Sequence, residues 1–360
     1  MKRFVLALAA ALALVPVYAQ KVQKAEINAL KSFLQQPSAN GSTNAQALNI
    51  TNLSDPTTWP GVKTEGGRVV EIDWSKKNLA GALNISGFAA LQRINVTDNR
   101  LTSLVCDNDP ALVRIDAGRN MLTNVSLQNC QSLQVLRVYR NRLSDISLTD
   151  VPLLKRLNIS SNYFVARDVS NAANLEYLNC QSNRLEELTL AGCQTLKTVY
   201  AGYNDISEMV LDGLVNLQNF NITGNKVSKL YLQNLPALST VMCSDNNMTQ
   251  LAFNNCQALL DVVASYNDLT TFSVENCPQL GFLNLNYNDL TQFTLTNQSF
   301  LQRVNLANNQ LLDVNLSFNS MLRYVNVSNN DLLSSLQLTA DNSLQQVVTQ
   351  YDDIDADQEF

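Results

Sequence analysis

The stretch LQVLRVYRNRLSDISL, residues 133–148, contains the pattern that decides the fold. Leu133, Leu136 and Val138 stand eight, five and three residues before Asn141. The same arrangement precedes twelve asparagines that follow one another at a spacing of 21 residues without insertion: Asn99, Asn120, Asn141, Asn162, Asn183, Asn204, Asn225, Asn246, Asn267, Asn288, Asn309 and Asn330. Only an internal repeat produces such a period, so the chain consists largely of repeated units.

Each unit predicts one coil of a stacked structure. With the asparagine counted as position 9, positions 1, 4, 6, 11, 14 and 16 are apolar and should point inward, whereas positions 3, 5, 7 and 8 should lie on or beside an exposed sheet. A unit that cannot bury its own apolar face is stable only when it stacks on its neighbours. The asparagine amide can bond backbone groups that the turn leaves unpaired, so the asparagine row is predicted to be structural.

The pattern L-x-x-L-x-L-x-x-N resembles the leucine-rich repeat family, within it the bacterial class of 21-residue repeats that includes the cysteine-containing, internalin-type surface proteins. The resemblance covers roughly Val69 to Asp352. It implies a right-handed, β-rich leucine-rich repeat solenoid with a parallel sheet on the concave face. About ten residues remain for the return path of each unit, which is too short for an average helix, so the convex side should be extended or 3-10.

The ends of the chain differ from the repeats. Residues 1–19 combine Lys2 and Arg3 with an apolar run and a short small-residue segment, which predicts a signal peptide and export to the periplasm, the cell surface or the medium. Residues 20–68 are predicted to form an N-terminal cap with a helix from Ala25 to Leu34. Residues 69–352 form the solenoid of about fourteen coils, and 353–360 an acidic tail. No later run is long and apolar enough for a transmembrane segment.

Composition argues against catalysis. The chain has no histidine, which removes the usual general base and the commonest metal ligand. No nucleophile, acid-base pair or metal cluster emerges, so we expect no enzyme activity, no cofactor and no metal. The seven cysteines occupy framework positions as small buried residues, although Cys256 and Cys277 lie on adjacent coils and could bond. Arg167 occupies inward position 14, and we expect a local bulge that turns it outward toward Asp168.

Arginine and tyrosine are concentrated at the outward positions. Seven of the thirteen arginines and seven of the ten tyrosines after residue 19 fall there, but no lysine does. Arginine and tyrosine without lysine are typical of a protein interface. The candidate ligand-binding residues are Arg93, Arg114, Arg119, Arg137, Tyr139, Arg140, Arg156, Tyr177, Tyr200, Tyr203, Tyr266 and Tyr287.

A second interpretation of this bias stays open. Tyrosine suits a pleated sheet by β-propensity, and arginines could neutralise Asp98 or Asp116 on the same face. Charge is also uneven along the chain: residues 20–231 carry a net charge of +3 and residues 232–360 a net charge of −11. The expected contact for the basic end is therefore an acidic group, either carboxylates of a protein or an acidic glycan with uronic or sulfate groups. Nucleic acid is an unsuitable partner for an exported acidic chain.

Two functions follow. The first is a monomeric, non-catalytic recognition protein whose Arg/Tyr face holds a protein partner, with adhesion implied by the internalin-type resemblance. The second is a cell-surface glycan-binding protein that uses tyrosine platforms and an outer asparagine row at position 5: Asn95, Asn158, Asn179, Asn221, Asn284, Asn305 and Asn326. A flat, solvent-open platform formed by Tyr266 and Tyr287 would favour glycan, whereas an arginine-lined groove would favour protein.

Overall fold

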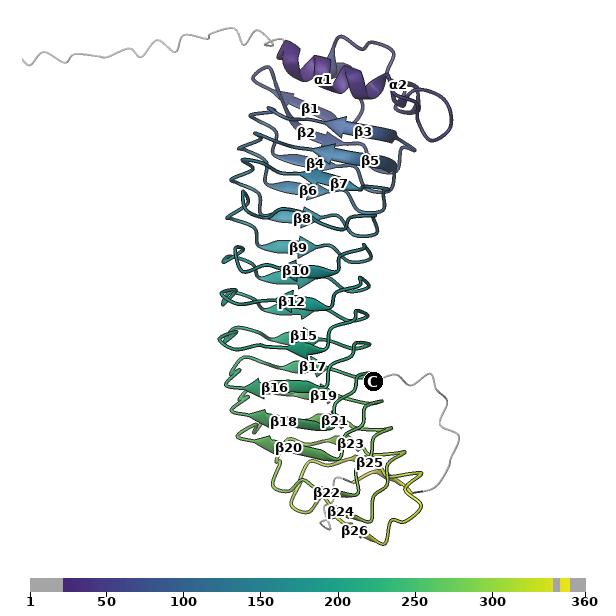
Figure 1. Cartoon of the computed structure of the whole chain (residues 1–360), viewed down its shortest axis with the longest axis vertical. Coiled ribbons are helices and arrows are strands. Elements are labelled where there is room, and N and C mark those ends of the chain that lie inside the picture. The colour runs from purple at the N-terminus through teal and green to yellow at the C-terminus, as the bar shows by residue number, and fades with distance from the viewer. Residues whose placement is uncertain (1–21, 339–343, 350–360) are drawn as a thin grey trace, which may run out of the picture.

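The computed structural model describes residues 22–338 and 344–349, and these wind into an elongated solenoid (Figure 1). Its coils stack along the long axis of the molecule, with short strands lying across that axis. This arrangement confirms the predicted leucine-rich repeat solenoid. The predicted signal peptide (1–19) and acidic tail (353–360) lie outside the described residues.

One sheet of fifteen strands runs through the whole described solenoid, and we call it the long sheet. Every coil contributes one short strand that pairs in parallel with its neighbours; only β1 pairs antiparallel, with β2. The strands are β1 (Val62–Glu65), β2 (Arg68–Asp73), β4 (Arg93–Asn95), β6 (Arg114–Asp116), β8 (Val135–Arg137), β9 (Arg156–Asn158), β11 (Tyr177–Asn179), β13 (Thr198–Tyr200), β15 (Asn219–Asn221), β17 (Thr240–Met242), β19 (Asp261–Val263), β21 (Phe282–Asn284), β23 (Arg303–Asn305), β25 (Tyr324–Asn326) and β27 (Gln346–Val348).

The return half of the coils is extended, as one of the two predicted alternatives required. Its strands form four smaller sheets, and the coil between β7 and β10 has no regular return strand. They are β3 (Ala80–Asn84), β5 (Arg100–Val105) and β7 (Asn124–Ser126); β10 (Ala166–Asp168) and β12 (Glu187–Thr189); β14 (Glu208–Met209), β16 (Lys229–Gln233), β18 (Gln250–Asn254) and β20 (Thr271–Glu275); and β22 (Gln292–Thr294), β24 (Asp313–Asn315) and β26 (Ser335–Gln337).

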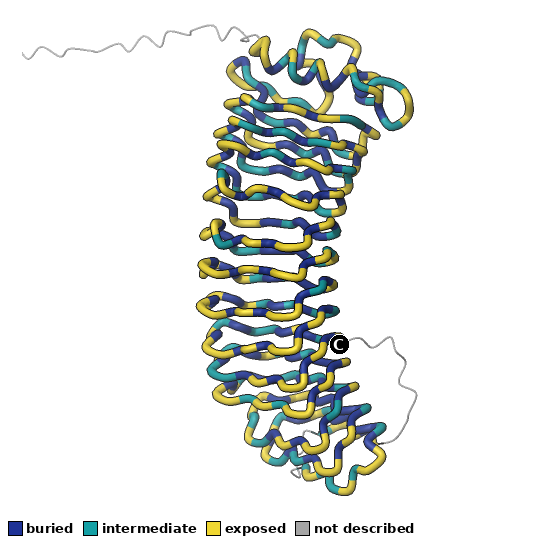
Figure 2. Tube along the Cα trace, viewed as in Figure 1, coloured by how far each residue is buried: buried dark blue, intermediate teal, exposed yellow. Residues whose placement is uncertain are grey.

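The register of the long sheet aligns equal repeat positions. Leu136 of β8 lies between Ile115 and Leu157 of its two neighbours, all at position 4. Inward residues therefore form one continuous apolar core, and buried and exposed residues alternate along the trace of each coil (Figure 2). Outward residues form straight rows parallel to the solenoid axis, so a side chain at a given position meets its counterparts one coil away.

The framework asparagines tie adjacent coils together. Asn141 accepts a hydrogen bond from the backbone N–H of Leu122 through Oδ1 at 3.0 Å. Its Nδ2 donates to the carbonyl oxygens of Ala117 and Val138 at 3.0 and 2.8 Å. These bonds satisfy backbone groups of both its own coil and the preceding one, which is the structural role expected from the sequence.

A cap covers the N-terminal end of the core. Helix α1 (Lys24–Leu34) lies across the first coils, followed by α2 (Asn44–Ala47) and the 3-10 turn Pro56–Thr58. The side-chain amide of Asn44 accepts a hydrogen bond from the backbone N–H of Ala80 in β3 and donates one to its carbonyl oxygen. The amide of Gln36 makes the same two bonds with Ala82. These two amides therefore bond backbone groups that the edge strand β3 would otherwise leave unpaired. In the long sheet, β1 is itself the edge strand and pairs with β2.

The prediction for Arg167 was wrong. Strand β10 pairs with β12 in unbroken register, and the Arg167 side chain is buried rather than turned outward. Its Nη1 donates to the carbonyl oxygen of Ile146 at 2.7 Å and lies 3.8 Å from a carboxylate oxygen of Asp145. The coil that contains Ile146 has no regular return strand, so its carbonyl is available as a partner; burial lowers the pKa of the guanidinium.

All seven cysteines are free and buried, as expected for framework residues. Cys256 and Cys277 do not form a disulfide, although their thiols are close enough to share a hydrogen bond. Burial raises the pKa of Cys130 and Cys243 to about 12 in each case, so these thiols are protonated at neutral pH.

Candidate binding face

None of the twelve candidate residues is buried, but the structure divides them into two groups. Seven lie at positions 3, 5 and 7 and project from the face of the long sheet: Arg93, Arg114, Arg137, Tyr139, Arg156, Tyr177 and Tyr200. Five lie at position 8, in the turn beyond the strand: Arg119, Arg140, Tyr203, Tyr266 and Tyr287. The sequence pattern had treated both groups as parts of one surface.

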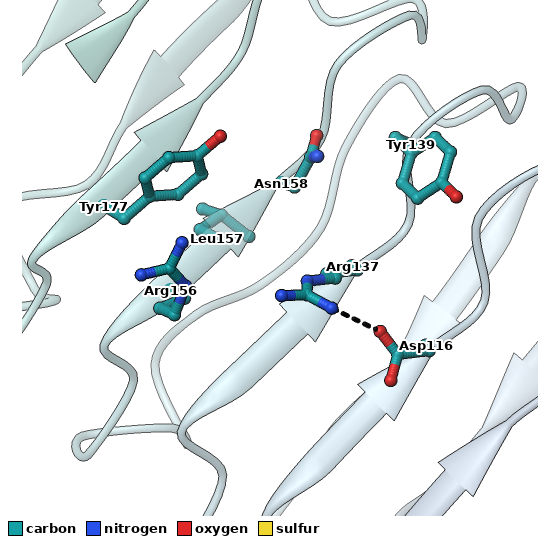
Figure 3. A pocket seen from close by; sticks show the side chains of 7 residues that line it. All are labelled: Asp116, Arg137, Tyr139, Arg156, Leu157, Asn158 and Tyr177. Carbon is teal, nitrogen blue, oxygen red and sulfur yellow. Dashed lines mark hydrogen bonds and ion pairs between the residues drawn. The ribbon is translucent and has the colours of Figure 1, made fainter. Parts of the chain in front are cut away.

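Four residues of the first group line a hollow of about 300 Å³ in the face of the long sheet (Figure 3). Strands β6, β8, β9 and β11 supply its walls, and all of its side chains come from four consecutive coils. Its lining residues are Asp116, Arg137, Tyr139, Arg156, Leu157, Asn158 and Tyr177. Arg137 and Arg156 lie on adjacent strands with their guanidinium groups on the same side of the sheet.

The arginines outnumber the carboxylates in and around this hollow. Asp116 bonds Arg114 on its own strand, and its other oxygen lies 3.3 Å from Nη1 of Arg137. Part of the second interpretation is therefore correct, because Asp116 does neutralise arginine on this face. One carboxylate cannot balance two guanidinium groups, however, and Arg156 has no ion-pair partner among the described residues. The hollow keeps an excess of positive charge.

Aromatic rings hold the arginine side of the hollow in place. The guanidinium carbon of Arg156 lies 4.4 Å from the centroid of the Tyr177 ring, within the range of a cation–π contact. Tyr177 in turn meets Tyr200 edge to face, with centroids 5.9 Å apart. This chain of contacts presents the guanidinium edge outward while its face is covered, so its N–H donors are available to a ligand.

A glycine that sequence reasoning missed makes room for Tyr139. A Cβ atom at Gly118 would lie 2.4 Å from the Tyr139 ring, so the ring rests on the glycine of the preceding coil. Gly224 accommodates Tyr203 in the same way. In both cases the signal in the sequence was a glycine at position 7 or 8 one coil away from a tyrosine at the same position.

The position-8 group adopts a backbone conformation that disfavours its residues. All five have positive φ, between 52° for Arg140 and 58° for Tyr203. This left-handed conformation is uncommon for residues other than glycine and asparagine, and bulky residues are rare there. Because these residues lie outside the strands, β-propensity does not explain tyrosine at these sites.

Tyr266 and Tyr287 do not form the flat platform that the glycan hypothesis required. Their rings stack on one another, with centroids 4.3 Å apart and planes 10° from parallel. Each ring therefore covers one face of the other instead of lying beside it in a common plane. Their outer faces and edges stay exposed.

The outer asparagine row is also occupied within the chain. In all seven coils, Oδ1 at position 5 accepts a hydrogen bond from the backbone N–H two residues later, as Asn158 does from Ser160. These bonds close the turn after each strand. The row thus has a structural use, and each of its oxygens already accepts at least one hydrogen bond within the chain.

Within residues 22–338 and 344–349, no group of three or more histidine, cysteine, aspartate or glutamate side chains is placed to hold a metal ion. No helix in the same ranges is both long and apolar enough to cross a membrane. The chemistry that the face offers is therefore hydrogen bonding, ion pairing and ring contact.

Solved structures with a similar fold include proteins of Listeria and Yersinia. The internalin InlF of Listeria monocytogenes is 19% identical, with 90% of this chain and 96% of that chain aligned at a TM-score of 0.57. YopM of Yersinia enterocolitica is 23% identical, with 75% of this chain and 59% of that chain covered at a TM-score of 0.59. A domain of InlJ of L. monocytogenes that includes a cysteine ladder is 20% identical, covering 71% and 67% at a TM-score of 0.50.

These likenesses show that the chain has the fold of the bacterial leucine-rich repeat proteins. No protein-family model and no curated protein sequence matches the chain.

Proposed function

We propose that this chain is a non-catalytic recognition protein that binds a protein partner through the face of the long sheet, centred on Arg137 and Arg156. The observation that carries the proposal is the hollow itself. It brings together guanidinium groups in excess of carboxylates and two anchored tyrosine rings, Tyr139 and Tyr177, on the long sheet. Arginine and tyrosine on rigid supports are the residues that dominate protein interfaces.

The charge of the hollow selects the partner. Arg156 is held by a ring rather than by a carboxylate, so an acidic side chain of the partner would gain a charge-assisted hydrogen bond without displacing an existing ion pair. Arg137 is paired through Nη1 only. The expected partner element is therefore an acidic segment with an apolar or aromatic residue that rests between Tyr139 and Tyr177.

The features of residues 1–19 and the internalin-type repeats favour action outside the cytoplasm, at a cell surface, as an adhesin. Glycan binding is the alternative function. Two observations count against it: the stacking of Tyr266 on Tyr287, and the engagement of the outer asparagine oxygens by backbone N–H groups. A sulfated glycan could still be attracted by the arginines, so the experiment includes one.

The test is a selection of displayed random peptides on the purified chain, repeated on an Arg137→Glu, Arg156→Glu variant and on a Lys229→Glu variant that carries its change on β16, away from the hollow. We expect acidic peptides from the wild type and the control but not from the double variant. Affinity should fall at least tenfold when both arginines are reversed. Equal enrichment on all three proteins would refute the site.

A heparin column run in parallel separates the alternative. Retention of the wild type at moderate salt, with loss in the double variant and no peptide selected, would assign the hollow to sulfated glycan rather than to protein.

A further inference from the structure

The turn that ends each long-sheet strand carries a row of charges distinct from the hollow. We call the residues at positions 8 and 10, on either side of the framework asparagine, the turn edge. Neighbours along this edge contact one another: Nζ of Lys226 lies 2.6 Å from a carboxylate oxygen of Asp205, and the Arg184 guanidinium lies 5.0 Å from the Tyr163 ring centroid. The turn edge is thus a continuous strip along the solenoid.

The sign of the charge reverses halfway along this strip. In the five coils from Asn99 to Asn183, the turn edge carries five arginines and a single acid, Asp98. In the seven coils from Asn204 to Asn330 it carries five aspartates and a single base, Lys226. The reversal falls between Arg184 and Asp205, on adjacent coils.

We propose that the turn edge is the contact surface of an antiparallel homodimer, in which a second copy of this chain lies along the first with its direction reversed. A strip that is basic at one end and acidic at the other is complementary to itself when one copy is rotated by 180° about an axis perpendicular to the solenoid. Such a twofold contact is isologous, because the same surface serves both copies.

The repeat fixes the register of this contact coil by coil. With the axis between the coils of Asn183 and Asn204, Arg184 faces Asp205 of the second copy, and Arg142 faces Asp245 of the second copy. Since both copies have the same spacing, the match continues outward without adjustment. Each pair occurs twice, once on either side of the axis.

The outer coils continue the match. Arg119 faces Asp268 of the second copy, and Arg100 faces Asp289 of the second copy. The exception is Asp98, which faces the same acidic coil as Arg100. Five coils of each copy therefore face five coils of the other, and arginine lies opposite aspartate in four of the five coil pairs.

Most of these side chains are available for the contact, whereas Asp205 pairs with Lys226 and Asp289 accepts a hydrogen bond from Gln310 within the same chain. The side chains of Arg100, Arg119, Arg142, Asp245 and Asp268 are exposed and make no hydrogen bond or ion pair within the described residues. Exposed ion pairs are individually weak, contributing up to about 1 kcal/mol, so the dimer depends on their number and on ionic strength.

The tyrosines of the turn edge supply apolar area between the charges. Tyr203, Tyr266 and Tyr287 are 62%, 55% and 44% exposed. In the register above, the coil of Arg119 faces the coil of Tyr266, so an arginine of one copy meets an aromatic face of the other. This arrangement replaces the expected monomer with a dimer, and it gives the position-8 tyrosines a use.

The test is sedimentation velocity of the full chain and of two charge-reversed variants, alone and mixed. One variant carries Arg140→Asp and Arg142→Asp; the other carries Asp245→Arg and Asn247→Arg. We expect the wild type to be dimeric at about 20 mM salt and monomeric at about 500 mM salt. Each variant alone should be monomeric at low salt, because like charges then face each other twice.

The equimolar mixture decides the register. A mixed dimer places the reversed positions of one variant opposite those of the other, and native pairs on the other side of the axis, so dimerisation should return to within about threefold of the wild type. Lys229→Asp and Asp313→Arg, on β16 and β24 away from the turn edge, are the matched controls and should leave it unchanged. A monomeric wild type, dimeric single variants, or a monomeric mixture would each overturn the proposal.

The hollow takes no part in this contact, since its residues lie at positions 3, 4, 5 and 7. Peptide binding by the hollow and dimerisation by the turn edge therefore succeed or fail separately.

Discussion

The two turns of each coil meet the same backbone requirement with different residues. The turn at position 8 and the turn at position 18 both place a residue in the left-handed conformation. Where position 18 has a positive φ, the residue is glycine or asparagine in every coil but one, and the exception is Phe318. The others are Gly87, Asn108, Asn129, Gly192, Gly213, Asn234, Asn255, Asn276 and Asn297. At position 8, the residue is glycine or asparagine in only three of the twelve coils, at Gly224, Asn308 and Asn329.

The left-handed conformation therefore explains the choice of residue at position 18, in the turn we call the return turn. It does not explain the choice of residue at position 8, in the turn edge. Arginine, serine and tyrosine at a left-handed position cost about 1 kcal/mol each relative to glycine or asparagine. Such a cost, repeated in seven coils, indicates that the side chains at position 8 are used for contacts with something else. The inward residue that follows each left-handed position shows the opposite trend. Position 9, after position 8, is asparagine in all twelve coils, whereas position 19, after position 18, varies among cysteine, alanine, valine, leucine and polar residues.

The largest expected effect on stability comes from a framework asparagine, which lies between the two turn-edge positions of its coil. Asn141→Ala leaves the backbone N–H of Leu122 without its partner. It also removes one of the two amide donors that bond the carbonyl oxygens of Ala117 and Val138, which keep Asn120 and Asn162 respectively. We expect the free energy of unfolding to fall by about 3 kcal/mol, since a buried unsatisfied N–H costs about 1 to 3 kcal/mol and each lost hydrogen bond to a carbonyl about 1 kcal/mol. Urea unfolding followed by circular dichroism measures the loss.

The matched variant is Cys130→Ala, at inward position 19 of the return turn. Its loss should be about 1 kcal/mol, because only a small buried side chain is removed. Equal losses in Asn141→Ala and Cys130→Ala would show that the two inward positions are equivalent, contrary to the comparison.

The second effect concerns a buried acid in a return turn. Asp109 occupies position 19, where its Oδ1 accepts from the N–H of Phe88 at 2.7 Å while Oδ2 has no partner. At the same position, Asn319 accepts from the N–H of Gln298 and uses Nδ2 to donate to the carbonyls of Leu295 and Leu316. Desolvation by burial raises the pKa of Asp109 to about 7, and the backbone N–H groups of Phe88 and Gly87 offset this only in part.

The sign of the pH dependence follows from that shift. The folded chain holds the Asp109 proton up to about pH 7, whereas an unfolded aspartate releases it near pH 4, so stability falls as pH rises between these values. Asp109→Asn, which supplies the donor that Asn319 has, should raise the free energy of unfolding by about 2 kcal/mol at pH 8 and by much less at pH 4. Thermal unfolding at the two pH values measures the difference; a gain that is the same at both would contradict the assignment.

A smaller gain is expected at the buried arginine of the return half. Arg167→Leu should stabilise the chain by about 1 kcal/mol, since leucine, valine or isoleucine fills position 14 in other coils and replacing a buried charge by an apolar residue is often favourable. The control is Leu188→Arg, at the same position of the next coil, on β12. It should lower the free energy of unfolding by several times that amount. If Arg167→Leu destabilises instead, the bond to the Ile146 carbonyl is worth more than the cost of burying the charge.

The sequence was sufficient for the period, the inward positions and the role of the framework asparagines, because each depends on a short pattern repeated many times. It failed at Arg167, where the outcome depended on a missing strand in the preceding coil that leaves the Ile146 carbonyl free. It also grouped position 8 with the positions on or beside the sheet, because the pattern carries no signal for the left-handed turn at that position. Whether the hollow and the turn edge bind partners stays a prediction.

The smallest effect tests the opening comparison most directly, by exchanging residues between the two turns. Arg140 has an exposed side chain and φ of 52°, and Asn129 has φ of 57° and donates to Oδ1 of Asn108 at 2.8 Å. Arg140→Asn should raise the free energy of unfolding by about 0.5 kcal/mol, because asparagine tolerates the left-handed conformation. Asn129→Arg should lower it by about 1 kcal/mol, since it adds that strain and removes the amide bond. If instead Arg140→Asn lowers stability, arginine at position 8 contributes to the fold within one chain, and the argument that this row serves an external contact loses its physical basis.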